Sequence, residues 1–124
     1  MEPPSESARS TTLRLDTTDR TDGTVCLTVD GDVDMTTSDY FRHTVMGLVH
    51  DPAISGLILD ASDLCFIDSN GVTVLVKARR AAGDRGISFG VTNARDSIRG
   101  LLEMLGVYDL LTQAHAGNAR SAHG

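Results

Sequence analysis

Residues 57–76 read LILDASDLCFIDSNGVTVLV, and this stretch decides the fold. Its first part, the apolar run at 56–59, predicts a short strand covered on both faces, because no polar side chain alternates with the aliphatic ones. After a polar loop at 60–63, the apolar pair at 66–67 extends or flanks that strand. The aliphatic residues that follow fit a helix over 70–82, so the stretch indicates a strand-to-helix unit.

Four polar or flexible residues, DSNG at 68–71, separate the last apolar pair from this helix. An aspartate or serine just before a helix accepts a hydrogen bond from an otherwise unpaired backbone N–H group and contributes roughly 1 kcal/mol. From spacing alone, Ser69 is best interpreted as this N-cap residue. Spacing does not decide whether one of the four side chains also has a functional role.

Further strands are predicted on both sides of this unit. Residues 13–15 and 25–29 alternate apolar and polar side chains around a turn-rich cluster at 17–23, which is typical of a β-hairpin. Residues 87–91 alternate in the same way. The sequence therefore predicts one antiparallel pair followed by strands that are separated by helices.

Two further helices are predicted from apolar periodicity. Thr36 and Asp39 have the spacing of a capping box for the first of them, which ends before Pro52. The last helix ends at Gly106, a C-cap residue, and 107–111 adds a short final element. The periodic faces are Phe41, Val45, Leu48 and Val49 in the first helix, Val72, Leu75, Val76 and Arg79 in the second, and Ile98, Leu101, Leu102 and Leu105 in the third.

The predicted order is β-β-α-β-α-β-α, which indicates an α/β domain. Helices between successive strands require parallel crossovers, so we expect a mixed sheet of about four to five strands, with an N-terminal hairpin and parallel β-α units. The chain has 124 residues, enough for one domain. We place this domain at 12–112, between tails at 1–11 and 113–124 whose Pro/Ser-rich or small-residue composition predicts disorder.

The net charge of −6 argues against nucleic-acid binding, which needs a basic surface to neutralise phosphates. The densest basic cluster is Lys77, Arg79 and Arg80, and we interpret it as a solvated helix face. The N-terminus lacks the charge and apolar pattern of a signal peptide, and no apolar run approaches the 18 residues of a membrane span. We therefore expect a cytoplasmic protein without a membrane partner.

The two cysteines, Cys26 and Cys65, lie in apolar runs and have no metal-binding spacing. They are interpreted as small buried thiols, as expected in a reducing cytoplasm. The segment DGDVDMTTSDYF at 30–41 starts like a calcium loop. It has Met35 at the glycine position and Phe41 at the position of the bidentate glutamate, so the calcium hypothesis fails. The histidines form no zinc motif, and no glycine-rich phosphate motif is present, so no metal or cofactor is predicted.

Enzymatic chemistry has little support in the sequence. Ser69 lacks the flanking glycines of a nucleophile elbow, and no histidine and aspartate follow in a recognisable hydrolase order. Asp60, Asp63 and Asp68 form a conceivable acid/base set, but loop carboxylates near a helix N-terminus are common. A small serine hydrolase using Ser69 remains an alternative from a different functional class.

The stretch LILDASDLCFIDSNGVTVLVKARR at 57–80 resembles the signature of STAS domains, specifically bacterial anti-sigma-factor antagonists. The segment VDGDVD at 29–34 resembles the turn before the family's first helix. The segments GISF at 86–89 and IRGLLEMLGV at 98–107 resemble its last strand and closing helix. The resemblance covers roughly residues 13–111 and implies the STAS fold.

The resemblance also implies a function. Unphosphorylated antagonists of this family bind an anti-sigma factor that is also a serine kinase of the histidine-kinase-like ATPase type, and this releases the sigma factor. Phosphorylation abolishes binding, and a phosphatase reverses it. Carried over, the phosphorylation site is Ser69, and Asp34, Asp68, Asn70, Gly71 and Thr73 form the partner-binding surface.

The family often has a second serine or threonine where this chain has Asn70, which leaves Ser69 as the only hydroxyl of the motif and the kinase preference open. Thr73, one helical turn later, is a weaker alternative phosphate acceptor. A STAS module of another assembly, such as a transporter accessory or a stress-sensing complex, is the second functional alternative. In each of these STAS hypotheses the chain itself is not an enzyme.

Overall fold

The computed structural model describes residues 13–19 and 22–112 of the chain. The predicted tails at 1–11 and 113–124 lie outside these residues. The elements, in chain order, are β1 (Leu13–Asp19), β2 (Thr24–Val33), α2 (Ser38–Val49), β3 (Gly56–Asp60), β4 (Leu64–Ile67), α3 (Ser69–Arg85), β5 (Ser88–Thr92), α4 (Asp96–Met104) and α5 (Tyr108–Thr112).

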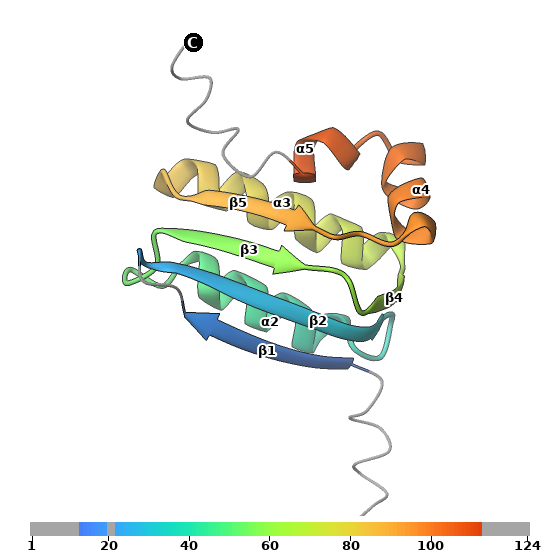
Figure 1. Cartoon of the computed structure of the whole chain (residues 1–124), viewed down its shortest axis with the longest axis horizontal. Coiled ribbons are helices and arrows are strands. Elements are labelled where there is room, and N and C mark those ends of the chain that lie inside the picture. The colour runs from blue at the N-terminus through green and yellow to red at the C-terminus, as the bar shows by residue number, and fades with distance from the viewer. Residues whose placement is uncertain (1–12, 20–21, 113–124) are drawn as a thin grey trace, which may run out of the picture.

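The strands form one mixed sheet of five strands in the order β1-β2-β3-β5, with β4 also paired to β2 (Figure 1). β1 is antiparallel to β2, whereas β3, β4 and β5 are parallel to their neighbours. After the loop at 61–63, β4 continues along the end of β2 beyond β3. The predicted mixed sheet of four to five strands, with its N-terminal hairpin, is therefore confirmed.

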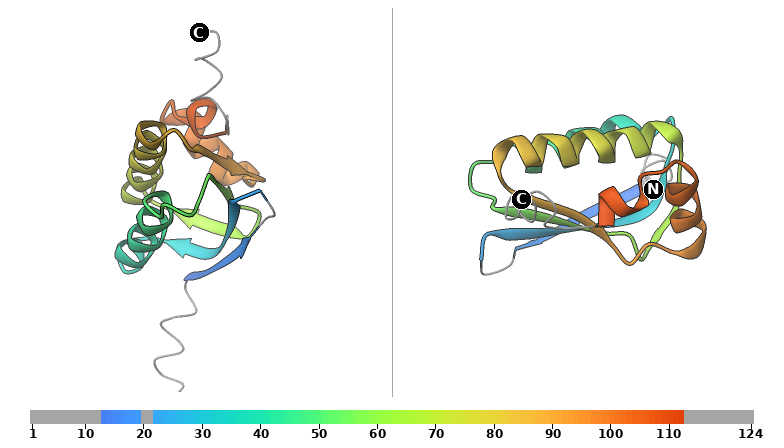
Figure 2. Two further views of the ribbon diagram at one scale, coloured as in Figure 1. Left: turned by 90° about the vertical axis from the view of Figure 1, so that its left-hand side faces the viewer. Right: turned by 90° about the horizontal axis from the view of Figure 1, so that it is seen from above.

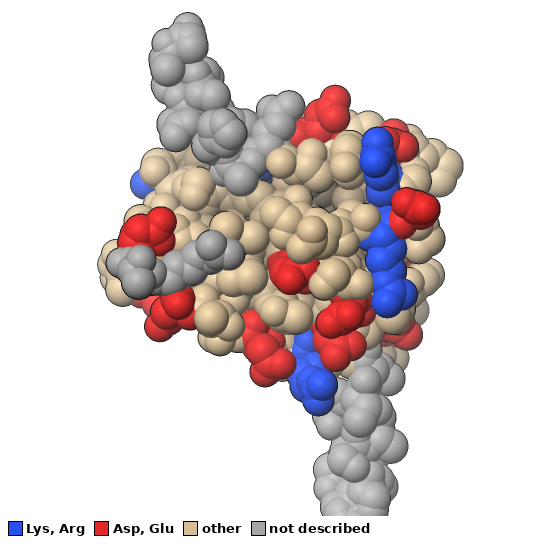
Figure 3. All heavy atoms as spheres, in the orientation of Figure 1, with Lys and Arg blue, Asp and Glu red and all other residues tan. Residues whose placement is uncertain are grey.

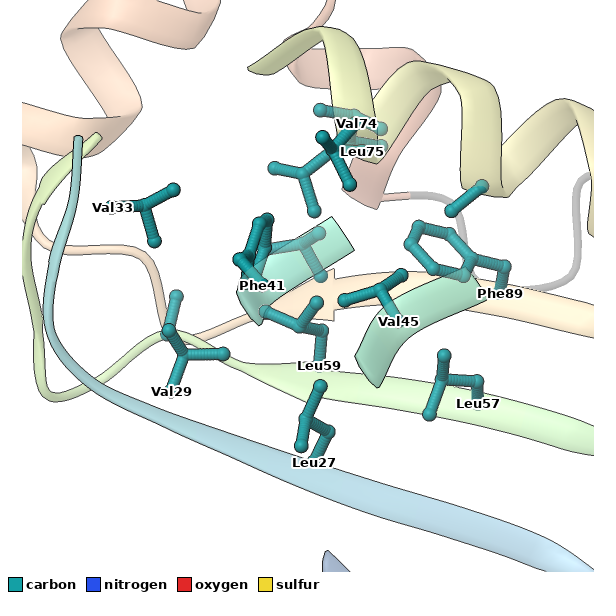
Figure 4. Packing of buried hydrophobic residues seen from close by; sticks show 14 of the residues in the cluster. Leu27, Val29, Val33, Phe41, Val45, Leu57, Leu59, Val74, Leu75 and Phe89 are labelled. Carbon is teal, nitrogen blue, oxygen red and sulfur yellow. The ribbon is translucent and has the colours of Figure 1, made fainter. Parts of the chain in front are cut away.

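Helices α2 and α3 lie side by side on one face of the sheet, and α4 and α5 lie near the β5 edge (Figure 2). Apolar side chains from β2, β3 and β5 point toward those of α2 and α3 and form the core (Figure 4). The largest of the fully buried side chains is Phe41, and aliphatic residues make up most of the rest. The scarcity of aromatic residues is therefore compensated by close packing of leucine, valine and isoleucine.

The expectation that β3 is covered on both faces is wrong. Leu57 and Leu59 are buried beneath the helices, whereas Ile58 points to the opposite face and is only half-buried. Its cross-strand neighbours on that face are Cys26 and Gly90. The apolar run at 56–59 has no polar residue in it because Ile58 is apolar although it lies on the sheet face that α2 and α3 leave uncovered.

Both cysteine assignments need correction as well. Cys26 is half-buried and Cys65 is exposed, and both are free thiols. Cys65 lies on the short strand β4, which has an irregular burial pattern, and its Sγ atom is 3.7 Å from Nη1 of Arg95. The apolar sequence context led to the prediction that both cysteines are buried. That prediction failed because sequence alone does not show which face of a strand points outward. Within the described residues, no helix is both long enough and apolar enough to cross a bilayer.

The first predicted helix starts later than its capping box implied. Helix α2 begins at Ser38, its N-cap residue is Thr37, and no side chain forms a cap hydrogen bond there. The hydroxyl of Thr36 instead donates to Oδ1 of Asp34. The predicted pairing of Thr36 with Asp39 is therefore wrong, because Asp34 already holds the loop in a turn.

Candidate functional site

The parallel pairing of β2 with β4 brings Asp34 and Asp68 to the same edge of the sheet. Val33 and Ile67 are register partners at the ends of these strands, and the backbone N–H of Asp68 donates to the carbonyl of Val33 at 3.0 Å. Asp34 comes directly after Val33, and Asp68 comes directly after Ile67. Because neighbouring strands lie about 5 Å apart, two carboxylates from distant parts of the chain become neighbours.

The N-cap residue of α3 is Asp68, which corrects the interpretation of Ser69 as the cap. Oδ1 of Asp68 accepts a hydrogen bond from the N–H of Gly71 at 2.9 Å, and the Asp68 backbone is extended, as an N-cap requires. Ser69 is therefore the first helical residue. The helix is also longer than predicted, extending from Ser69 to Arg85, and ends at Gly86 with a φ of 76°.

This capping arrangement leaves the Ser69 side chain available. Ser69 is exposed, and its hydroxyl forms no hydrogen bond with any residue in the described part of the chain. Its carbonyl accepts a hydrogen bond from the Thr73 hydroxyl at 3.0 Å. Of the two candidate phosphate acceptors, Thr73 therefore has a hydroxyl that is already hydrogen-bonded, whereas Ser69 has a free hydroxyl at the positive end of the helix dipole.

Gly71 is buried and contributes space rather than a contact surface. A Cβ atom at this position would lie 2.6 Å from Cγ1 of Ile67 and 2.7 Å from Cγ1 of Val33. The absence of a side chain therefore allows the first turn of α3 to pack directly on the ends of β2 and β4. Asn70, by contrast, is exposed beside Ser69.

Asp34 is held in place by a compact loop between β2 and α2. Its backbone N–H donates to the hydroxyl of Thr37 at 2.9 Å, and that hydroxyl donates to the carbonyl of Asp32 at 2.8 Å. The hydrogen bonds from the hydroxyl and the backbone N–H of Thr36 hold the pKa of the Asp34 carboxyl below its usual value. Asp34 is therefore ionised at neutral pH.

Two large apolar side chains next to the aspartates are exposed. Met35, which follows Asp34, is 77% exposed, and Phe66, whose register partner is Asp32, is 51% exposed. Sequence reasoning missed both, because a methionine and a phenylalanine in apolar segments are expected in the core. Exposed apolar side chains therefore stand close in sequence to both aspartates, since Met35 follows Asp34 and Phe66 lies two residues before Asp68.

The carboxylates that were considered for acid/base chemistry do not converge. Asp63 and Asp68 stand at opposite ends of β4, roughly 16–17 Å apart at the strand rise of about 3.3 Å per residue. The backbone N–H of Ser62, together with the Asn93 side chain, lowers the pKa of Asp60. A general acid at neutral pH needs a raised pKa, so Asp60 does not resemble one.

Comparison with known proteins identifies the family of this fold. The family model of the STAS domain matches residues 17–119, which is most of the chain. The chain belongs to the STAS domain family. The sheet order and the two helices on one face described above are consistent with the STAS fold.

Solved STAS structures also resemble this chain. An anti-sigma factor antagonist from Mycobacterium paratuberculosis has a TM-score of 0.70 and 25% identity, covering 80% of this chain and 82% of its own. The anti-sigma factor antagonist SpoIIAA in its unphosphorylated form has a TM-score of 0.62 and 19% identity, with coverages of 73% and 83%. Phosphorylated SpoIIAA from Bacillus has a TM-score of 0.65 and 18% identity, covering 81% of this chain and 89% of its own. Curated protein sequences gave no match.

Proposed function

We propose that this STAS protein is an anti-sigma-factor antagonist controlled by phosphorylation of Ser69. In its unphosphorylated form it binds an anti-sigma factor with serine kinase activity and thereby releases the sigma factor in the cytoplasm. Phosphorylation by that kinase ends the interaction, and a phosphatase restores it. The protein itself is a binding module that acts neither as an enzyme nor on nucleic acid.

The observation that carries this proposal is the free, exposed hydroxyl of Ser69 at the first helical position of α3. Asp68 already caps the helix, so modification of Ser69 removes no hydrogen bond that holds the fold. The family membership and the likeness to SpoIIAA, a protein known in both phosphorylated and unphosphorylated forms, support the same assignment.

In the free protein, a phosphate on Ser69 is tolerated. It adds about −1.5 to −2 charges at neutral pH. The helix dipole stabilises an anion at this position by about 0.3–1 kcal/mol. Asp34 and Asp68 oppose it, but all three groups lie at the surface, where water and salt screen the repulsion. We therefore expect phosphorylation to leave the fold unchanged.

In a complex, the same phosphate is unfavourable. A partner that covers Asp34, Asp68 and the apolar Met35 and Phe66 removes water from the edge where the phosphate sits. A change from 99% bound to 99% free needs about 5.5 kcal/mol of differential binding. A buried phosphate without a matching cation loses several kcal/mol of hydration, which is of the required size. Phosphorylation is therefore an interface switch.

The test compares captured partners from lysate of the source organism. Wild type and Ser69→Ala should retain an ATPase of the histidine-kinase type, identified by mass spectrometry, whereas Ser69→Asp should retain at least tenfold less. Incubation of the purified pair with ATP should place phosphate on Ser69 of the wild type alone.

Ser97→Asp is the matched control, because it adds the same charge to the first turn of another helix, α4, at an exposed serine. It should retain as much ATPase as the wild type. Equal capture by Ser69→Asp, or phosphate mapped to Thr73, would contradict the proposal. Amide spectra of the phosphorylated protein should change near Ser69 and stay constant in β1 and β5.

A further inference from the structure

A groove of about 490 Å³ lies between α2 and α3, on the helical side of the molecule. Met46 from α2 and Val74 from α3 give it an apolar floor, since Val74 is buried and Met46 is half-buried. Arg42 lines one wall and Lys77 the other. At one end the groove reaches Asn70 and Thr73, close to Ser69, and toward its other end it is lined by Met46 and Lys77.

The charge of α2 and α3 is opposite to that of the rest of the chain. The two helices carry five lysines and arginines and two aspartates, although the chain has a net charge of −6. Figure 3 shows the other side of the molecule, where acidic side chains are spread over the uncovered sheet face and basic ones lie toward its rim. The helical layer is therefore the one that attracts an anionic partner.

The cations of the groove are available for a partner. Arg79 and Arg85 are engaged in the fold, because Arg79 donates to the carbonyl of Leu110 and Arg85 to that of Val49. Lys77, in contrast, forms no ion pair or hydrogen bond within the described residues. Arg42 pairs only with the exposed Asp39 among them, at 3.3 Å. Such an exposed pair contributes little and is easily exchanged for a partner's carboxylate.

We propose that this groove binds an acidic amphipathic helix of a partner protein. The outward sides of α2 and α3 form a parallel pair of ridges (Figure 2), and a third helix fits between them with its apolar stripe on Met46 and Val74. Glutamates or aspartates on both flanks of that stripe then meet Arg42 on one side and Lys77 on the other. This binding goes beyond the Ser69 switch: the groove shares Asn70 and Thr73 with the proposed partner-binding surface, but it does not use the hydroxyl of Ser69.

A protein helix fits these features better than an anionic membrane does. The apolar residues are recessed between the helices, whereas insertion into a bilayer requires apolar side chains that project from the surface. The chain's overall negative charge also repels an extended anionic surface, but it has little effect on a narrow ligand confined to the groove. The groove therefore selects for a slender acidic partner.

The test uses two synthetic peptides with a fluorescent label. Both have leucine at every third or fourth position, and they carry either glutamate or lysine on the flanks. The glutamate peptide should bind and shift the amide signals of Arg42, Met46 and Lys77, and salt should weaken it. The lysine peptide should not bind. Lys77→Glu should reduce the affinity for the glutamate peptide at least tenfold.

The double variant Arg42→Glu/Lys77→Glu should reverse the preference and bind the lysine peptide. Arg14→Glu is the matched control, because Arg14 is an exposed arginine of β1 on the opposite layer, and it should change affinity less than twofold. Ser69→Asp should also bind normally, which separates this proposal from the phosphorylation switch. No binding of the glutamate peptide, equal binding of both peptides, or binding only to phosphatidylglycerol vesicles would overturn the inference.

Discussion

Helices α2 and α3 begin at the same edge of the sheet, each shortly after an aspartate that follows a strand, and their N-termini use similar residues differently. Before α2, Asp34 engages the hydroxyl of Thr36, and Thr37 bridges two backbone groups. At α3, the carboxylate of Asp68 caps the helix itself. No hydroxyl is needed there, so the hydroxyl of Ser69 stays free.

This difference shows how a fold can prepare a side chain for modification. A threonine whose hydroxyl holds a loop together cannot receive a phosphate without loss of stability. A serine beside an aspartate cap can, because the aspartate has taken over the structural role. The two N-termini should therefore respond differently to substitution.

The largest effect is expected in the loop before α2. Thr37→Val keeps the side-chain shape but removes the hydroxyl that bonds Asp34 and Asp32, leaving two polar backbone groups without their partner. Thr37 is only 8% exposed, so the free energy of unfolding should fall by about 2 kcal/mol. Chemical denaturation measures this change. Thr36→Val, which alters an exposed hydroxyl, is the control, and an equal loss there would contradict the comparison.

The next effect concerns the close approach of α3 to the strands. Gly71→Ala places a Cβ atom against Ile67 and Val33, and the overpacking outweighs the gain in helix propensity. We expect a loss of about 1–2 kcal/mol in the free energy of unfolding. Gly83→Ala in the same helix meets nothing within 4 Å and should stabilise by about 0.5–1 kcal/mol. Changes of the same sign in both variants would refute the steric explanation.

A smaller effect is expected at the cap of α3. Asp68→Ala removes the acceptor for the N–H of Gly71 and should cost about 1 kcal/mol in the free energy of unfolding. Asp68→Asn keeps an acceptor and should recover most of that loss. Ser69→Ala should change stability by only a few tenths of a kcal/mol. Thermal unfolding of the three variants, followed by circular dichroism, tests whether Asp68 or Ser69 is the cap.

The smallest effect is the pH dependence of Asp34. Its folded pKa is lowered, chiefly by the Thr36 hydroxyl, so its charged form is favoured by folding. This contribution is complete above the unfolded pKa, at about pH 4, and disappears as the pH falls through the lower folded pKa. Carbon NMR titration should therefore give Asp34 a midpoint below 3.8, the ordinary pKa of an aspartate side chain. A midpoint at or above that value would show that the turn does not stabilise the ionised carboxylate of Asp34.

Much of the fold could be predicted because its signals are local. The alternation at 25–29 and the helical spacing of Phe41, Val45 and Val49 are patterns within a few residues, and both appear in the structure. Gly106 does terminate the third predicted helix, α4, with a φ of 77°, but the C-cap residue is Leu105, one position earlier than predicted. The predictions were wrong where one local sequence pattern is compatible with two structures. Cys65 in an apolar run proved exposed, and Thr36 proved to be part of a turn rather than the helix cap.

The sequence by itself determined the alternation of strands and helices, though not that β4 is a separate strand paired to β2, together with the STAS resemblance and the position of Ser69 at the start of a helix. These depend on periodicity, turn residues and a contiguous motif. Only the tertiary structure decided that Asp68 caps α3, that the register of β2 with β4 places Asp34 beside it, as the resemblance implied, and that Arg42 and Lys77 line opposite walls of a groove. The physical reason is that hydrogen-bond partners, strand register and helix packing are contacts between distant segments, which spacing along the chain does not encode.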